Sequence, residues 1–128
     1  MKPREINLST GTKIFLGKNS KNNVELIASF KGKENIILHT VAPGSPFCVI
    51  KKLNPTDDEI YEAGVTTASK SQNWRDKKSD VAIHIFTGHD VKKTFWMKEG
   101  SWELKNHPKE IIIKKKDILN LTKINAKR

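Results

Sequence analysis

Residues 54–74, NPTDDEIYEAGVTTASKSQNW, predict the clearest helix of the chain and set its fold class. Thr56 and Glu59 have the spacing of a capping box, in which two side chains bond the free backbone N–H groups of the helix start. The acidic residues at this end suit the positive end of the helix dipole. The side expected to face inward consists mainly of small residues: Ile60, Ala63, Gly64, Thr67, Ala68 and Ser71. We therefore expect this helix, ending near Trp74, to pack closely on a sheet.

Short apolar runs on both sides of this helix predict the strands of that sheet. We expect strands at residues 6–8, 13–16, 36–39, 47–50, 81–86 and 111–113. The first two should form a hairpin with its turn at Gly11, and the next two are joined across Pro43-Gly44. The last should pair with residues 101–104 across a turn at 106–108. These local connections favour antiparallel pairing.

A second helix is predicted to open at residues 17–20, and the spacing of Asn22 to Glu25 is similar to a capping box. Its inward side chains are expected to be Val24, Ile27 and Ala28. A short helix over residues 117–124 would end the chain. The sequence thus predicts an α+β fold with a mixed, largely antiparallel β-sheet, two main α-helices and a short C-terminal helix. The length of 128 residues suits a single domain.

The charge is the most unusual property of the composition. The chain has 24 basic and 14 acidic residues, a net charge of +10 and a pI near 9.8. The excess is +4 in residues 1–50, zero in 51–104 and +6 in 105–128. Such a charge favours nucleic acid, the ribosome or an anionic membrane as a partner, although a basic surface that only aids solubility is the alternative.

Several kinds of chemistry are not expected from this sequence. Cys48 is the only cysteine, so no intrachain disulfide forms, and it lies in an apolar run that predicts burial. The four histidines are dispersed, and no nucleophile–base pair or carboxylate pair stands at a recognisable spacing. We expect no catalytic residue, no metal and no cofactor. No signal peptide or membrane span is evident, which predicts a soluble cytoplasmic protein.

Residues 89–102, HDVKKTFWMKEGSW, combine lysines with large aromatic side chains. Lysines bind phosphates as point charges, and aromatic rings stack on unpaired bases. The alternative is that Phe95, Trp96 and Trp102 belong to the core while the lysines stay solvated.

Three stretches together resemble the NFACT-R family, the RNA-binding domain of ribosome quality-control proteins of the RqcH/NEMF type. The first is GTKIFLGKNSKNN at residues 11–23, and the second combines Leu38-His39 with Pro43-Gly44-Ser45. The third is residues 90–93 followed by Gly100. The resemblance covers about residues 9–115 and leaves 116–128 as a basic C-terminal helix or tail.

The sequence departs from the family pattern at three places. Ile37-Leu38 stands where the family has an aromatic pair before the histidine, and Pro46 replaces a common second histidine. Phe95-Trp96-Met97 stands where many members have glycine and proline. These differences affect base-specific or partner contacts more than the fold.

The resemblance implies a stand-alone, non-enzymatic RNA-binding module for tRNA, rRNA or the ribosome, linked to translation quality control. The type of nucleic acid is left open between RNA and DNA, because related eukaryotic proteins are linked to DNA binding. A protein-interaction module that docks on a ribosomal or quality-control partner through residues 95–97 is the alternative; the oligomeric state is left open. Candidate RNA contacts are Lys18, Asn19, His39, Ser45, Lys92, Lys93, Trp96 and Lys98. Trp96 would stack on a base, and Lys114–Lys116 with the basic tail are the fallback site.

Overall fold

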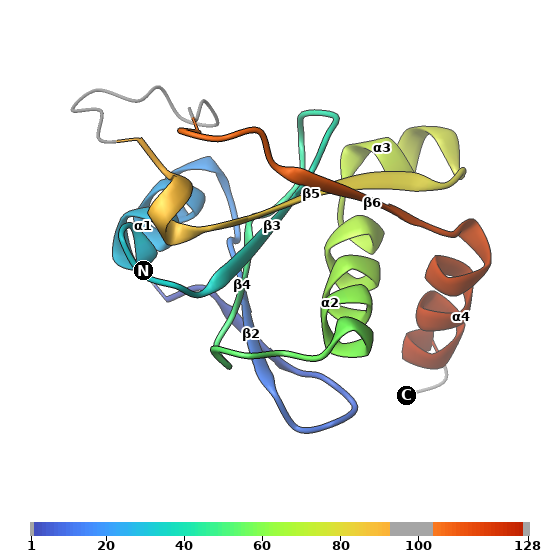
Figure 1. Ribbon diagram of the computed structural model, residues 1–128. Helices are drawn as coiled ribbons and strands as arrows, with labels where there is room; N and C mark the ends of the chain where they lie inside the picture. The colour runs from blue at the N-terminus through green and yellow to red at the C-terminus, as the bar shows by residue number, and fades with distance from the viewer. Residues whose placement is uncertain (1, 93–103, 127–128) are drawn as a thin grey trace.

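The computed structural model describes residues 2–92 and 104–126. The strands of this part are β1 (Arg4–Asn7), β2 (Lys13–Leu16), β3 (Ile36–Thr40), β4 (Cys48–Ile50), β5 (Val81–Thr87) and β6 (Lys109–Ile113). The helices are α1 (Ser20–Phe30), α2 (Asp57–Ser69), α3 (Gln72–Lys77), the 3₁₀ turn η1 (Gly88–Asp90) and α4 (Lys115–Ala126). Figure 1 shows their arrangement.

The strands form one sheet in the order β1-β2-β4-β3-β5-β6, with every neighbouring pair antiparallel. This arrangement confirms the predicted α+β class. The predicted first hairpin is also confirmed, since Asn7 pairs with Lys13 and Gly11 has a φ of +89°. The expected connection across Pro43-Gly44 likewise joins two paired strands, β3 and β4.

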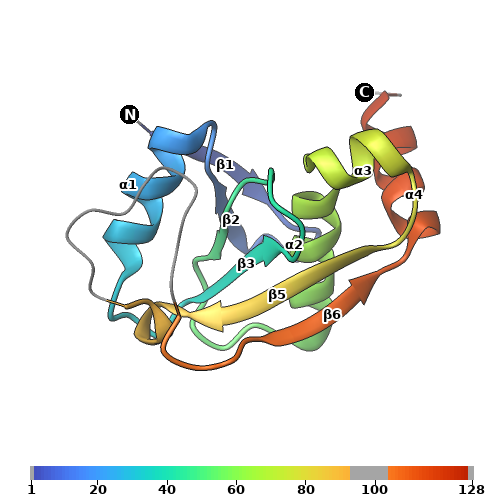
Figure 2. The same ribbon diagram turned by 90° about the horizontal axis from the view of Figure 1, so that it is seen from above.

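Helices cover both faces of the sheet (Figure 2). On one face, α2, α3 and α4 pack on a cluster that includes Leu38, Cys48 and Ile113. On the other face, α1 packs on a cluster that includes Ile37 and Val49. The central strands are therefore buried on both sides, which explains their unbroken apolar sequences. Cys48 is fully buried, as predicted, and burial raises the pKa of its thiol to about 12.

The helix predicted over residues 56–74 is two helices in the structure. α2 ends at Ser69, and Ser71 then starts α3 by accepting a hydrogen bond from the Trp74 N–H (3.1 Å). The Ser71 hydroxyl also donates to the Ala68 carbonyl (2.7 Å). The prediction of one helix was wrong because inward-facing residues keep a helical spacing across the break, which conceals the serine cap.

The predicted opening of α1 at residues 17–20 is confirmed, but the expected cap at Asn22 was wrong. Asn19, three residues earlier, caps this helix and accepts a hydrogen bond from the Asn22 N–H (2.8 Å). Ala28, expected inside, is exposed, and Val24 is only half-buried. The buried face consists of Asn22, Asn23, Leu26, Ile27 and Phe30. Two polar residues therefore take inward positions that a purely apolar pattern overlooks.

The C-terminal part differs from the prediction in its pairing. Strand β6 pairs with β5, with Ile111 opposite Ile83, and the predicted partner 101–103 lies outside the described residues. Leu104 instead forms a bridge with Val91. The predicted hairpin therefore lies mainly outside the described residues, and the described pairing of β6 is with a strand that lies farther back in the chain. Helix α4 is longer than predicted, beginning at Lys115.

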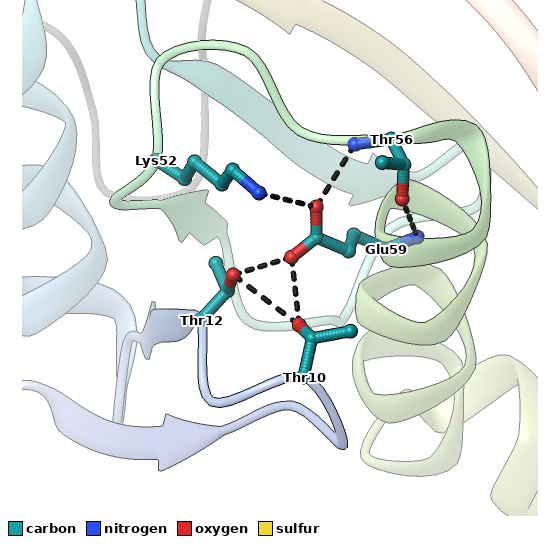
Figure 3. A network of polar contacts seen from close by, with 5 residues as sticks. All are labelled: Thr10, Thr12, Lys52, Thr56 and Glu59. Atoms are coloured by element: carbon teal, nitrogen blue, oxygen red, sulfur yellow. Dashed lines mark hydrogen bonds and ion pairs between the residues drawn. The ribbon is translucent and has the colours of Figure 1, made fainter.

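A buried carboxylate joins the first hairpin to the start of α2 (Figure 3). Glu59 accepts hydrogen bonds from the hydroxyls of Thr12 and Thr10, the latter at 2.7 Å. It also accepts from the Thr56 N–H (3.0 Å) and pairs with Lys52 Nζ (3.1 Å). The predicted capping box of Thr56 and Glu59 is thereby confirmed. The same carboxylate fixes β1 and β2 relative to α2.

Candidate functional site

A polar hollow of about 340 Å³ lies where the N-terminal end of α1, the β3–β4 loop and the α2–α3 junction meet. Figure 2 shows these three segments along one side of the molecule. The lining residues come from five separate parts of the chain: Arg4, Gly17, Lys18, Asn19, Ser20, Asn23, Gly44, Ser45, Pro46, Lys70, Gln72 and Arg75.

Positive charge dominates this lining. Arg4 comes from β1, Lys18 from the turn before α1, Lys70 from the end of α2 and Arg75 from α3. No carboxylate occurs among the described residues that line the hollow. Asp76, beside it, pairs with Arg75 Nε at 3.0 Å. The lining therefore carries an excess of positive charge, of the kind that attracts polyanions.

Asparagine side chains hold the polar frame of the hollow in place. Asn19 caps α1, and Asn22 Oδ1 accepts a hydrogen bond from the Lys18 N–H (2.9 Å). Asn23 Oδ1 accepts from the buried Phe47 N–H (3.0 Å). These bonds fix the turn that holds Lys18 and the end of the loop that holds Pro46. Because the first N–H groups of a helix carry positive partial charge, the start of α1 adds to the local potential.

Two glycines allow these segments to approach closely. A Cβ on Gly17 would lie 1.8 Å from Asn23 Oδ1, so only glycine fits beside this asparagine. Gly44 has a φ of +91°, and a Cβ there would lie 2.6 Å from the Gln72 side chain. The Gln72 N–H also donates to the Gly44 carbonyl (2.8 Å). The β3–β4 loop is thus anchored directly on the start of α3.

The structure brings together three of the predicted RNA contacts. Lys18, Asn19 and Ser45 all line the hollow, although they come from two motifs separated in the sequence. Ser45 is buried, and its hydroxyl accepts from the Thr40 N–H (3.1 Å). Its main role in the described structure is to hold the loop. A role in RNA binding stays a prediction for all three residues.

The other predicted contacts lie elsewhere. His39 is outside the lining and stacks on the Phe47 ring at 4.3 Å between centroids. Burial lowers the pKa of His39, so its imidazole is neutral at pH 7 and offers phosphates no charge. Lys92 is exposed, just beyond η1. Lys93, Trp96 and Lys98 lie outside the described residues, as do Phe95 and Trp102.

Sequence reasoning missed three of the four cations. Arg4, Lys70 and Arg75 stand in no recognisable motif, and each lies in a different element or element end. One sequence signal could have placed Lys70. Ser71 directly follows it, and a serine can cap the start of a new helix, so the pair marks a break between α2 and α3. Recognising that cap would have placed Lys70 at a junction instead of on a continuous helix surface.

A second hollow, of about 580 Å³, is unlike the first in its chemistry. Its lining is mainly apolar, and the charges of Asp57, Lys109 and Glu110 include both signs. Among the described residues, no three potential metal ligands gather into a group. In the same part of the chain, no helix has the length and apolar character needed to cross a membrane. The basic hollow is therefore the stronger candidate site.

An antiparallel α+β fold with a cation-lined, carboxylate-free hollow defines a module suited to binding polyanions. The sequence model of the NFACT protein RNA binding domain matches residues 2–106. The chain therefore belongs to this family of RNA-binding domains, as the resemblance in its motifs predicted. A comparison with curated proteins finds no match.

A solved structure shares the fold. It is the C-terminal of the fibronectin/fibrinogen-binding protein from Streptococcus suis, with a TM-score of 0.79 and 22% sequence identity. The similarity covers 94% of this chain and 49% of that one, so this chain spans about half the length of the solved chain. At this identity, the comparison shows a common fold and nothing about ligands.

Proposed function

We propose that this chain is a non-enzymatic module that binds tRNA or rRNA and acts with the ribosome in translation quality control in the cytoplasm. The basic hollow holds phosphates of the RNA in this proposal. The observation that supports it best is the convergence of Arg4, Lys18, Lys70 and Arg75 on one hollow without a described carboxylate in the lining. Membership of an RNA-binding family supports the choice of ligand.

Charge contacts of this kind have a measurable signature. Each phosphate neutralised by a lysine or arginine releases counterions, so log K falls with log salt by about 0.7–0.9 per contact. Contacts from the four cations predict a slope of roughly −3 to −4. An apolar protein interface would show a much weaker dependence on salt.

The test compares two double variants that lose the same charge. Lys18→Ala with Lys70→Ala removes two lining cations, whereas Lys21→Ala with Lys77→Ala removes two exposed lysines outside the lining. Binding to tRNA, rRNA fragments and duplex DNA is measured from about 50 to 300 mM salt. The first variant should reduce the magnitude of the slope by about 1.4–1.8 and bind RNA more weakly than the second.

Equal binding by the two variants would exclude the hollow as the phosphate site. Stronger binding of DNA than of RNA would favour the DNA-binding alternative. The protein-interaction alternative is docking on a ribosomal or quality-control partner. Tight, salt-insensitive binding to such a partner with no affinity for RNA would overturn the proposal. Association with ribosomes, measured by sedimentation of cell extracts, tests the link to translation.

A further inference from the structure

We infer that the basic hollow binds the phosphorylated end of an RNA strand, a terminal phosphomonoester, rather than a stretch of continuous backbone. This inference rests on the proposed function and names the part of the RNA that the hollow takes. It follows from how the cations are arranged, from the charge that they require and from the size and rigidity of the space.

The cations converge instead of forming a stripe. Proteins that follow a nucleic-acid backbone line up their basic residues along a groove. Here, Arg4 on a strand, Lys18 on a turn and Lys70 at a helix end all border the same hollow. Cations from a strand, a turn and a helix end around one hollow favour a terminal phosphate over a long run of backbone phosphates.

The amount of charge points to the same ligand. A phosphodiester carries one negative charge, whereas a terminal phosphate carries about −1.5 to −2 at pH 7 and has three acceptor oxygens. Arg75 pairs with Asp76, but no described ion pair joins Arg4, Lys18 or Lys70 to a carboxylate. Three cations without described carboxylate partners are better neutralised by a terminal phosphate than by one phosphodiester.

The space is small and rigid. Its volume of about 340 Å³ is near the lower limit for pockets that take small ligands, so it suits one nucleotide end rather than a folded segment. Hydrogen bonds hold its walls together: the Gln72 N–H donates to the Gly44 carbonyl (2.8 Å), and the Phe47 N–H donates to Asn23 Oδ1 (3.0 Å). Ser20 and Gln72 add neutral hydrogen-bond donors to the lining.

The test uses one single-stranded RNA of about ten nucleotides in three forms: with a 5′-phosphate, with a 3′-phosphate and with hydroxyls at both ends. At about 150 mM salt, one phosphorylated form should bind about tenfold more tightly than the hydroxyl form. Lys18→Ala with Lys70→Ala should abolish this advantage. The matched variant Lys21→Ala with Lys77→Ala should keep it, since neither lysine lines the hollow.

The pH dependence gives a second, independent result. The second pKa of a phosphomonoester is about 6, so the advantage of the phosphorylated RNA should grow as the pH rises from about 5 to 7.5. The described charged side chains in the lining are Arg4, Lys18, Lys70 and Arg75, with no histidine and no carboxylate among them. Taking the ratio of the affinities of the two RNA forms cancels effects of groups outside the hollow, such as His39.

The outcomes separate this inference from the proposed function. If all three RNAs bind equally and with a steep salt dependence, the end-binding inference is wrong and the proposed function stands. If none of them binds, and tRNA does not bind either, the proposed function itself fails. Inorganic phosphate is the remaining probe. If it competes at the same concentration as the phosphorylated RNA, the hollow takes any phosphate, which overturns the choice of an RNA end.

Discussion

At the scale of single residues, Glu59 shows how a buried charge can be satisfied by its neighbours. The side chain is 2% exposed. The hydrogen bond from the Thr12 hydroxyl, with those from the Thr56 N–H and the Thr10 hydroxyl, holds the pKa of Glu59 well below its usual range. Its ionised form is therefore the one that the fold requires. Through it, the strand that bears Arg4 is fixed relative to α2.

Glu59→Gln should lower the melting temperature at pH 7, because an amide cannot accept this set of hydrogen bonds. The pKa of Glu59 is lower in the folded than in the unfolded state, so its contribution is fully present above about pH 5. That contribution is lost as the pH falls below the unfolded value of 4.5. Thermal melts of both proteins from pH 7 to pH 2 should therefore converge at acid pH. A constant difference in melting temperature would contradict this assignment.

Gly44 provides a second prediction at this scale, with Gly11 as its control. Both have a positive φ, but a Cβ on Gly11 would meet nothing within 4 Å, whereas one on Gly44 would meet Gln72. Alanine at either position should destabilise the fold by about 1–3 kcal/mol through backbone strain. Gly44→Ala should be the more destabilising and should alone weaken RNA binding. Chemical denaturation and RNA titration of both variants measure this; equal RNA affinities would contradict it.

At the scale of elements, the junction between α2 and α3 positions the hollow. Lys70 ends one helix, and Gln72 and Arg75 belong to the next, so the change of direction brings all three to the same site. Ser71 maintains the junction through the bonds of its buried hydroxyl. In a continuous helix, Lys70 would lie on the side opposite Gln72 and Arg75, which are neighbours at i and i+3.

Ser71→Ala should destabilise the fold by about 1 kcal/mol through loss of the cap, and should also weaken RNA binding. Thr56→Ala is the matched control, because it removes the cap at the other end of α2, away from the hollow. Both variants should unfold at lower denaturant concentration, but only Ser71→Ala should lose affinity for RNA. If both lose affinity equally, general destabilisation explains the effect, and the junction has no special role.

At the scale of the whole molecule, the hollow and Lys92 lie toward opposite ends of α1. The hollow is at its first residues, whereas η1, which precedes Lys92, is at its last turn, where the Gly32 N–H donates to the Gly88 carbonyl (2.8 Å). The helix has 11 residues and is therefore about 16 Å long. An RNA that contacts both regions must extend at least this far across the surface.

Lys92→Ala with Lys93→Ala should reduce the salt slope by about 1.4–1.8 and leave the stability within about 0.5 kcal/mol of the parent. If the hollow and this region contact one RNA independently, combining these changes with Lys18→Ala and Lys70→Ala should add the two losses of binding free energy. Binding isotherms and thermal melts of the three variants measure this. If the Lys92–Lys93 variant binds as the parent does at every salt concentration, this region is not part of the RNA site.

The sequence by itself determined the kinds of elements and several of their ends. The capping box of Thr56 and Glu59, the turn at Gly11 and the apolar strands depend on hydrogen bonds and burial patterns within a few residues. Those relations are visible in a linear chain. The family motifs were visible for the same reason, and they included Lys18 and Ser45 in the candidate site.

Only the tertiary structure decided which segments meet. Strand β6 pairs with β5, and its Ile111 and Ile113 complete a sheet face that α2 and α4 cover, a choice that no local turn signal encodes. Likewise, Arg4, Lys70 and Arg75 become one site only when a strand, a helix end and a second helix pack together. Charge convergence depends on distances in space, and in a folded chain these distances are set by long-range packing of the core rather than by separation along the sequence.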